Sequence, residues 1–307
     1  QEGQLWFNYN ASALKGYGTA AGVPTSTWSS GGSMNTAKGQ AMGAGATNTA
    51  AIVFGGFVPG SPGTIANTES YDGSTFTEVN DLNTTRRTAA GFGTQTAALL
   101  ATGITTPGVN IITNVESWDG TNWTEITDVN TGRYYVQGCG TQTAGIISGG
   151  YIAANQAVTE TWDGTSWTEV SDLNTARYGL VVSGVQTAAL ASAGNGGFAL
   201  NEEWDGSSWT EVGDLNTPRS ATNGAGTVTQ ALVFTGYSPP VSGTIDSNEV
   251  WNGTSWTEIN DLSTARDATA SAGSDVSTFA AGNETGGVQS ATEEFTASAA
   301  VSTVTTS

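Results

Sequence analysis

The side chains of this sequence that could do chemistry are carboxylates and arginines, and they come in copies. The stretch WDGTSWTEVSDLNTAR, from Trp162 to Arg177, holds three carboxylates and one guanidinium within 16 residues. Near copies begin at Tyr71, Trp118, Trp204 and Trp251. Paired carboxylates can serve as general acid and base or hold Ca²⁺, and a set of arginines can hold an anion. A repeated motif can equally serve the fold, because every copy meets the same neighbours.

Catalysis is disfavoured by the symmetry of the carboxylates and by the absence of histidine. A catalytic pair should break the symmetry of the copies, and no acidic cluster is unique to one of them. The absence of His removes the commonest general base and the commonest transition-metal ligand. Calcium stays open, because it takes carboxylate and carbonyl oxygens, although no EF-hand loop is present. We therefore expect a non-enzymatic protein, with no catalytic residue, no metal ligand and no cofactor.

A basic residue ends every copy of the motif. The six are Lys38, Arg86, Arg133, Arg177, Arg219 and Arg266. By symmetry they would form a ring that could grip an anion. Each full copy also offers carboxylates at fixed offsets, such as Glu169 and Asp172. Because repeated opposite charges suit ion pairs between units and hydrogen bonds to loop carbonyls, we predict a structural role for the basic residues.

The Asp-Gly pair inside the motif, as in Asp163-Gly164, predicts a tight hairpin turn. The Asp side chain would accept hydrogen bonds from the backbone just after it, and Gly would supply the positive φ. The fifth copy has Asn252 here, which turns as well as Asp. A sialidase Asp box needs a residue between Asp and Gly, and none is present.

The aromatic residues on either side of this turn, such as Trp162 and Trp167, could stack on sugar rings if they were exposed. They recur at fixed places in nearly every copy, where neighbouring units must pack on one another. We therefore predict that they are buried, which stabilises by roughly 1.5–3 kcal/mol for each such side chain on area grounds.

The charge of the chain excludes several partners. The 307 residues include 8 Lys and Arg against 27 Asp and Glu, which gives a net charge of −19. A polyanion of this kind repels nucleic acids and anionic membrane surfaces. No apolar run approaches the length of a membrane span, and the one cysteine, Cys139, allows no internal disulfide. We expect no nucleic-acid partner and no membrane insertion.

The elements that position these side chains repeat with the period of the motif. The last aromatic of each unit is Trp28, Phe76, Trp123, Trp167, Trp209 and Trp256, at spacings of 48, 47, 44, 42 and 47 residues. Thr, Val, Ile and aromatics dominate, and no stretch shows a long helical period. In the third unit we predict strands at 134–138, 143–148, 159–162 and 167–170. Six such units predict an all-β protein, a six-bladed β-propeller of four-stranded antiparallel blades.

The two ends of the sequence predict how the ring closes. The sixth unit stops after three strands at Phe295, while Trp28 lies in an orphan strand near the start. If that strand completes the last blade, N- and C-terminal strands mix and no open edge remains. A rival pairing fills the same place with residues 301–305. We expect an N-terminal attachment segment at 1–23, the propeller at 24–296, and a C-terminal strand or tail at 297–307.

The order of motifs within a unit is the next feature. It runs Gly149-Gly150, Trp162-Asp163-Gly164, Trp167-Thr168, Leu173-Asn174, Arg177. This order resembles kelch repeats over about residues 24–295, and the resemblance implies a propeller. The turn between the two aromatics is shorter than in most kelch units. The Gly doublet is intact only at Gly55-Gly56 and Gly149-Gly150, and is relaxed elsewhere to Thr102-Gly103, Ala193-Gly194, Thr235-Gly236 and Ala281-Gly282.

The near-identity of the copies, the GTQTAAL turns and the opening EGQLWFNYNASALKGYG are similar to kelch-type structural proteins of tailed bacteriophages, especially marine ones. That resemblance implies a virion appendage or decoration protein, tethered by a short N-terminal segment and contacting the host surface or neighbouring subunits. Trp6, Phe7, Tyr9 and Tyr17 crowd this segment. Exposed aromatics would form a sticky patch, so we expect virion proteins or a second copy of the chain to cover them.

Recognition is expected on one face of the propeller. The GTQT and DGTS turns share a face and stay uniform, whereas the connections after each second strand lie on the other face and differ in length and chemistry. Uniform turns are typical of a scaffold and divergent loops of recognition. These loops begin at Phe57, Ile104, Tyr151, Asn195, Tyr237 and Asn283. We predict that Phe57, Tyr151 and Tyr237 bind a host glycan or surface protein; the alternative is that they pack the rim.

Three functions follow from these features. The first is a non-enzymatic structural and binding protein of a phage particle, located on the virion or outside the cell. The second is a secreted or surface carbohydrate-binding propeller, and the third is a glycan-degrading enzyme. Binding without turnover of host polysaccharide would support the first two, and the presence of the protein in purified particles would separate the first from the second.

Overall fold

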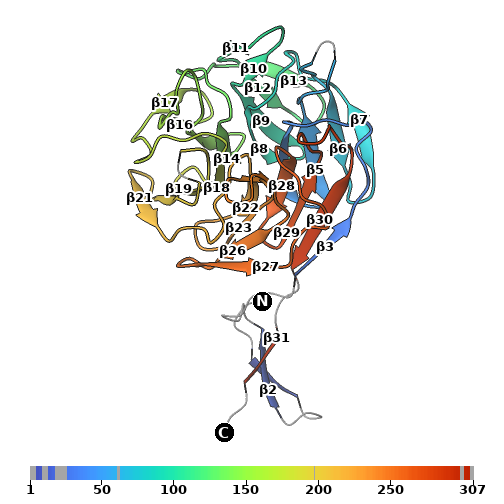
Figure 1. The fold of residues 1–307 in the computed structure, drawn as a ribbon, viewed down its shortest axis with the longest axis vertical. Helices are drawn as coiled ribbons and strands as arrows, with labels where there is room; N and C mark the ends of the chain where they lie inside the picture. The colour runs from blue at the N-terminus through green and yellow to red at the C-terminus, as the bar shows by residue number, and fades with distance from the viewer. Residues whose placement is uncertain are drawn as a thin grey trace.

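The protein is a six-bladed β-propeller, as the sequence predicts (Figure 1). The computed structural model describes residues 5–8, 13–17, 26–60, 63–196, 198–297 and 301–304, and describes side chains from Ser26 to Ala297 within these ranges. The described residues form strands, turns and loops without any helix. Within them there is accordingly no helix of the length and apolarity that crossing a membrane takes. Six four-stranded antiparallel sheets surround a central axis.

Each blade runs from an innermost strand at the axis to an outermost strand. Blade one is β4 (Met42–Thr47), β5 (Ala50–Phe54), β6 (Thr68–Tyr71) and β7 (Phe76–Val79). Blade two is β8 (Ala90–Thr94), β9 (Ala97–Ala101), β12 (Val115–Trp118) and β13 (Trp123–Ile126). Blade three is β14 (Gln137–Thr141), β15 (Ala144–Ser148), β16 (Thr159–Trp162) and β17 (Trp167–Glu169). Blade four is β18 (Val181–Val185), β19 (Ala188–Ser192), β20 (Asn201–Trp204) and β21 (Trp209–Val212). Blade five is β22 (Asn223–Gly226), β23 (Ala231–Phe234), β26 (Asn248–Trp251) and β27 (Trp256–Ile259). Blade six is β28 (Ala270–Ser274), β29 (Ser277–Ala281), β30 (Thr292–Ala297) and β3 (Ser26–Ser30).

The ring closes through mixed termini, which confirms the predicted closure. Strand β3 pairs antiparallel with β30 and sets Trp28 directly opposite Phe295, with ring centroids 5.3 Å apart. The rival pairing is wrong: β31 (Val301–Val304) pairs with β2 (Ala13–Tyr17), and β2 pairs with β1 (Leu5–Asn8). Strand β3 fills the fourth place of blade six, in the order β28-β29-β30-β3.

The predicted attachment segment and the predicted C-terminal strand therefore share one small sheet, in the order β1-β2-β31. Figure 1 shows β2 and β31 outside the ring of blades, beyond β3. Of the aromatics expected to mediate assembly, Trp6 and Phe7 lie in β1 and Tyr17 ends β2. Tyr9 lies outside the described residues.

Both ends of the chain leave the propeller on the face of the uniform turns. Ser26, the first residue of β3, is paired with Ala297, the last residue of β30. The Ala297 N–H donates to the carbonyl of Val276, in the turn between β28 and β29. Asn48, in the matching turn of blade one, donates through Nδ2 to the Phe295 carbonyl at 3.3 Å. The variable loops are on the opposite face.

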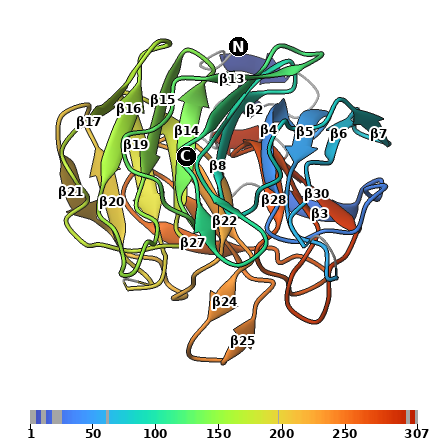
Figure 2. The same ribbon diagram turned by 90° about the horizontal axis from the view of Figure 1, so that it is seen from above.

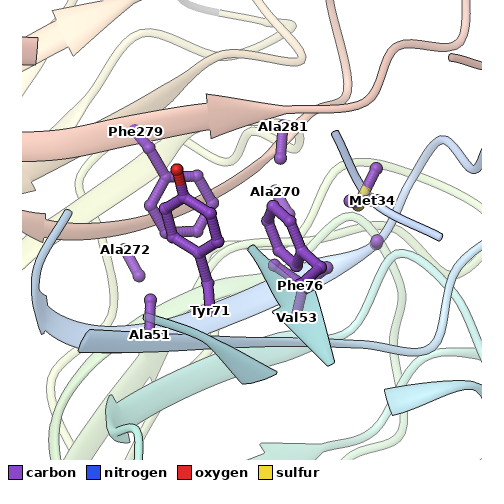
Figure 3. Close-up of a cluster of buried hydrophobic side chains, with 10 residues drawn as sticks. Met34, Ala51, Val53, Tyr71, Phe76, Ala270, Ala272, Phe279 and Ala281 are labelled. Carbon is purple, nitrogen blue, oxygen red and sulfur yellow. The ribbon is translucent and has the colours of Figure 1, made fainter. Parts of the chain in front are cut away.

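The hydrophobic core lies between the blades. One cluster packs blades six and one together through Ala51, Val53, Tyr71, Phe76 and Phe279, among others (Figure 3). In blade three, Trp162 and Trp167 are 2% and 6% exposed, with centroids 5.3 Å apart. The prediction that these rings are buried is confirmed. Since Trp162 also donates through Nε1 to the Gln142 carbonyl at 3.0 Å, burial leaves that polar atom satisfied.

The glutamines of the GTQT-type turns explain why these turns stay uniform. Gln95 donates through Nε2 to the Tyr71 carbonyl at 2.8 Å, and Gln142 and Gln186 donate in the same way to the carbonyls of Trp118 and Trp162. These three turns thus tie blades two, three and four to the blades that precede them, and Asn48 ties blade one to blade six. The turns of blades five and six carry Val228 and Asp275 at this position, so the glutamine bond serves three of the boundaries.

The Asp-Gly turns have the predicted geometry. Asp163 Oδ1 accepts hydrogen bonds from the N–H groups of Thr165 and Ser166, both at 2.8 Å, and Gly164 has a φ of +95°. Asn252 Oδ1 makes the equivalent contacts at 2.9 Å in the fifth copy. The hydroxyl of Thr165 and the backbone N–H groups hold the pKa of the Asp163 carboxyl below its usual range, and similar bonds lower that of Asp72 to about 2.

Replacing Asp163 with Asn should flatten the acid side of the stability profile while leaving the turn intact. The folded pKa of Asp163 is depressed, so its contribution is present above the unfolded pKa of about 3.9 and is lost as pH falls through the folded value. The variant should melt near the wild-type temperature at about pH 6 and lose less on acidification to about pH 2. Calorimetry across this range checks the difference, and identical profiles would show that the turn carboxylate is not linked to folding.

Candidate binding site

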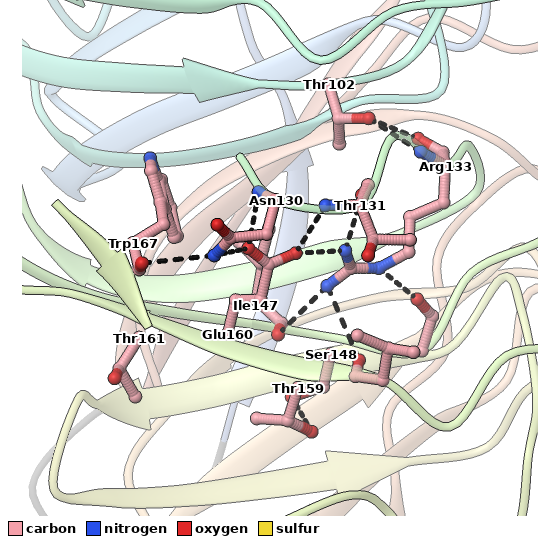
Figure 4. Close-up of polar contacts among 12 residues, drawn as sticks. Thr102, Asn130, Thr131, Arg133, Ile147, Ser148, Thr159, Glu160, Thr161 and Trp167 are labelled. Atoms are coloured by element: carbon pink, nitrogen blue, oxygen red, sulfur yellow. Dashed lines mark hydrogen bonds and ion pairs between the residues drawn. The ribbon is translucent and has the colours of Figure 1, made fainter. Parts of the chain in front are cut away.

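The six buried basic residues each form an ion pair inside a blade. Arg133 Nη1 lies 2.7 Å from Glu160 Oε1, with both side chains fully buried (Figure 4). Arg133 also donates from Nε to the Gly149 carbonyl at 2.8 Å, and Asn130 donates its N–H to Glu160 at 2.8 Å. The same pairing occurs in each blade: Lys38–Glu69, Arg86–Glu116, Arg133–Glu160, Arg177–Glu202, Arg219–Glu249 and Arg266–Glu293.

The acidic partners are not the carboxylates expected from the sequence. Glu169 lies in the outermost strand and is exposed, whereas Glu160 lies in the third strand and is buried. The basic residue stands just before the innermost strand of its own blade, so its side chain reaches the third strand of that blade. Every unit has a Glu two residues before the last aromatic residue of its third strand, and this pattern in the sequence marks the buried partner.

The channel along the axis offers no charge to a ligand. It is a cavity of about 170 Å³ lined by the six innermost strands, with glycines such as Gly138 and Gly184 and uncharged residues such as Gln137, Ser183 and Asn223. The six basic side chains are buried in their pairs and do not line it. The alternative in which they grip an anion in the channel is therefore wrong.

A closed circle of backbone hydrogen bonds surrounds the channel mouth on the variable-loop face. Its members stand two residues after each basic residue: Gln40, Thr88, Tyr135, Gly179, Ala221 and Ala268. Each N–H donates to the carbonyl of the member in the preceding blade, at 2.8–3.3 Å, and Gln40 closes the circle on Ala268 at 2.8 Å. All six have φ between 47° and 62°, a left-handed conformation that costs a non-glycine residue about 1–3 kcal/mol.

The residues between the basic residue and the circle meet the variable loops. Tyr134 is bridged to Tyr151, and Ser220 to Tyr237. The equivalent pairs are Gly39–Phe57, Arg87–Ile104 and Tyr178–Asn195, and the Asp267 N–H donates to Asn283 Oδ1 at 3.0 Å. The first residue of each variable loop is thus held beside the channel mouth, where the side chains of all six blades converge.

The structure separates the three predicted ligand-binding residues. Tyr151 packs against Tyr134 and Tyr178, with centroids 5.6 Å and 5.2 Å away. Phe57 instead carries the guanidinium of Arg87 over its ring, at 4.6 Å from the centroid. Tyr237 is 39% exposed in β24 (Tyr237–Ser238), which pairs with β25 (Gly243–Thr244) in a hairpin that projects from the ring (Figure 2). The structure shows no aromatic contact for Tyr237 within the residues it describes.

Four tyrosines form a closed cluster that the sequence did not reveal. Tyr135 completes it, with centroids 5.3 Å from Tyr134 and 5.6 Å from Tyr178. The four side chains, Tyr134, Tyr135, Tyr151 and Tyr178, are all partly exposed. We expected 134–138 to be a strand, but β14 begins only at Gln137, which frees Tyr134 and Tyr135 for the mouth. The signal was the dipeptide after each basic residue, which reads GQ, RT, YY, YG, SA and DA in the six units.

A polar network joins this cluster to the other side of the mouth. Gln40 donates through Nε2 to Tyr135 Oη at 3.1 Å and to Glu284 Oε1 at 2.6 Å. Its own Oε1 accepts from Arg87 Nη1 at 3.0 Å. Burial, with a smaller effect from Glu284, raises the pKa of Tyr135 to about 12, and burial raises the pKa of Glu284. Tyr135 therefore stays neutral and spans the mouth from blade three to blade one.

The mouth of the channel offers aromatic faces, tyrosine hydroxyls and the Arg87 guanidinium, which can bind a ligand by stacking and hydrogen bonding. Within residues 26–60, 63–196 and 198–297, no group of three or more His, Cys, Asp or Glu side chains is placed to hold a metal ion. Comparison with models of known families found no match, and comparison with curated proteins found no significant match.

Proposed function

We propose that the protein is a non-catalytic structural and binding protein that is anchored on its turn face and recognises a glycan on its variable-loop face. The observation that carries this proposal is the opposition of two features. Both ends of the chain leave the ring where Ser26 pairs with Ala297, on the turn face. The tyrosine cluster of Tyr134, Tyr135, Tyr151 and Tyr178 lies at the mouth on the other face.

The placement of the chain ends and the tyrosine cluster on opposite faces suits a protein that is anchored by one face and displays the other. A protein held through its terminal sheet exposes the surface farthest from the attachment. The small sheet β1-β2-β31 contains Trp6, Phe7 and Tyr17 and is the part we propose to contact virion proteins or a second copy of the chain. The tyrosine cluster then faces outward, toward whatever the displayed protein meets.

The tyrosine cluster suits a sugar ring. Tyrosine offers an apolar face and a hydroxyl at low conformational cost, and aromatic faces pack against the C–H side of sugars. Tyr151 stands at 72° to Tyr134 and 71° to Tyr178, so the cluster presents both edges and faces. Because the rings brace one another, little side-chain freedom remains to be lost on binding.

The finer assignment rests on the motif order. The kelch-like order of Gly doublet, aromatic-Asp-Gly turn, Trp-Thr and Arg supports a kelch-type propeller. Its similarity to kelch-type structural proteins of tailed phages supports a place on the virion. A secreted carbohydrate-binding propeller would use the same cluster, and the presence or absence of the chain in purified particles distinguishes the two.

Loss of the tyrosine cluster should abolish binding with little effect on folding. We expect the wild-type protein to bind host cells or an oligosaccharide array, and the triple change of Tyr134, Tyr151 and Tyr178 to Ala to remove most of that binding. The matched control is Tyr237→Ala, which removes an exposed tyrosine of the same face that lies outside the cluster. Melting temperatures of both variants test the fold.

Two results would overturn this proposal. One is wild-type binding by the triple variant, and the other is a partner that protects only the turn face in hydrogen exchange. Equal losses in the triple variant and in Tyr237→Ala would instead place recognition on the projecting hairpin rather than on the cluster.

A further inference from the structure

Resting on the proposed function, we propose that the glycan carries a single acidic sugar, whose carboxylate or sulfate is bound by Arg87 while its ring lies on the tyrosine cluster. The site is the mouth of the channel between blades one and three. Arg87 is bridged to Ile104 of its own blade and lies beside Phe57 of blade one.

The charge inventory singles out Arg87. Of the 8 basic residues, six form the buried ion pairs and Lys15 lies in the N-terminal segment. Arg87 is the remaining one, and it has no ion pair within the described part of the chain. The protein has a net charge of −19, with 27 Asp and Glu against 8 Lys and Arg, so an arginine without a carboxylate partner is unusual in it.

The contacts of Arg87 hold the guanidinium in place and leave donors free. Phe57 packs against one face of the group, and Gln40 Oε1 accepts from Nη1. The Nε atom is buried and donates to no described residue, and Nη2 makes no hydrogen bond within the described residues. Since the buried Nε is not open to a ligand, the donors left for a carboxylate or sulfate are those of Nη2 and the second hydrogen of Nη1, which lie in one plane.

The acidic groups near the mouth form no ion pair with Arg87. Glu284 is separated from Arg87 by the Gln40 amide, and its pKa is raised because burial outweighs the opposing effects of the Gln40 hydrogen bond and the Arg87 charge. Asp267 accepts from the Thr285 N–H at 3.0 Å and from the Thr285 hydroxyl at 2.7 Å. Both carboxyls are thereby turned to partners in blades one and six, and Arg87 faces the tyrosines of blade three.

The overall charge limits how acidic the ligand can be. Charges farther away than about 8–10 Å are largely screened at physiological salt, so one local cation can attract one local anion. A long polyanion would run over the remaining acidic surface and be repelled. The site therefore fits one acidic sugar in an otherwise neutral chain, and a polyuronate should bind better as salt is raised.

The test uses an oligosaccharide array in matched pairs, with the full-length protein. Each acidic member carries one uronic acid, sialic acid or sulfated sugar, and its neutral partner lacks only the charge. We expect binding to acidic members alone, with uronic and sialic acids reporting a carboxylate and the sulfated sugars reporting a sulfate. Arg87→Gln should weaken that binding about tenfold or more, and Arg87→Lys should lie between, because it keeps the charge without the planar donors.

The outcomes of these experiments distinguish failure of the acidic-sugar inference from failure of the glycan-binding proposal. Equal binding of neutral and acidic partners, or an unchanged Arg87→Gln variant, overturns the acidic-sugar inference and leaves the glycan-binding proposal standing. Absence of binding to any member, with an acidic peptide bound instead, overturns both. Polygalacturonate should gain affinity between low salt and about 0.15 M salt, and a steady loss over that range contradicts the single-acid ligand. Val241→Ala, which changes an exposed residue of the projecting hairpin, serves as the unaffected control.

Discussion

Arg133→Ala should lower the free energy of unfolding by about 3–5 kcal/mol, since it leaves the Glu160 carboxylate buried without its cation. Both side chains are fully buried, so water cannot replace the lost partner. The change also removes the donor to the Gly149 carbonyl, and Gly149 begins the loop that carries Tyr151. Chemical denaturation with a linear extrapolation measures the difference.

Arg87→Ala is the matched control for this prediction. It removes the arginine directly after Arg86, the buried basic residue of blade two, and Arg87 itself belongs to no buried ion pair among the described residues. We expect a loss of less than about 1 kcal/mol from the cation–π contact and one hydrogen bond. The two variants should be opposites, with Arg133→Ala binding ligand once folded and Arg87→Ala folding normally without binding it. Similar stability losses in both would show that the buried pairs do not hold the blades.

Deleting residues 1–30 should abolish cooperative folding, because it removes the outer strand of blade six. Strand β3 supplies Trp28, whose ring lies 5.1 Å from that of Phe234 in blade five and 5.3 Å from that of Phe295. Loss of a packed Trp alone costs about 3–5 kcal/mol, and the deletion also exposes β30 as a free edge that invites aggregation. We expect a broad, low-temperature transition and oligomers in light scattering.

The shorter deletion of residues 1–22 is the control for closure. It keeps β3 and removes β1 and β2, so the ring should melt near the wild-type temperature. We also expect this variant to fail to assemble with its virion partner or with a second copy. If both deletions melt alike, the seam between β3 and β30 does not close the ring, and if the shorter one unfolds the ring, the terminal sheet is part of the core.

The fold could be predicted because the same pattern of strands and turns recurs in six units. Spacing gave the number of blades, the orphan Trp28 gave the seam, and Asp163-Gly164 gave the turn. The bounds of individual strands were harder to predict. The sequence predicts a strand at 134–138, whereas β14 spans Gln137–Thr141, so Tyr134 and Tyr135 lie at the mouth and not in a strand. The contact of Gln40 with Tyr135 joins residues 95 apart in the sequence, and no local pattern reports such a distance.

The relaxed Gly doublets show how tertiary contacts overrule a local preference. Thr102 stands where Gly55 and Gly149 stand in other blades, and it adopts the same left-handed conformation, with φ values of 59°, 63° and 70°. Its hydroxyl donates to the Arg133 carbonyl at 2.7 Å, and the Arg133 N–H donates back to it at 2.8 Å. These bonds offset the backbone cost, so a departure from the motif in the sequence is no departure in the structure.

The circle of backbone bonds at the mouth bears on how such a protein can grow. Every unit contributes one N–H and one carbonyl, so a duplicated or lost unit changes donors and acceptors by the same number, and the circuit stays complete at any count. The peptide dipoles also run head to tail around the circle and cancel, which leaves no charged end to protect. The number of unsatisfied hydrogen-bonding groups at the axis therefore does not change when gene duplication adds a unit. What limits the number of blades is the wedge of side chains between them, where Tyr71 and Phe279 fill one boundary and tryptophan pairs fill others.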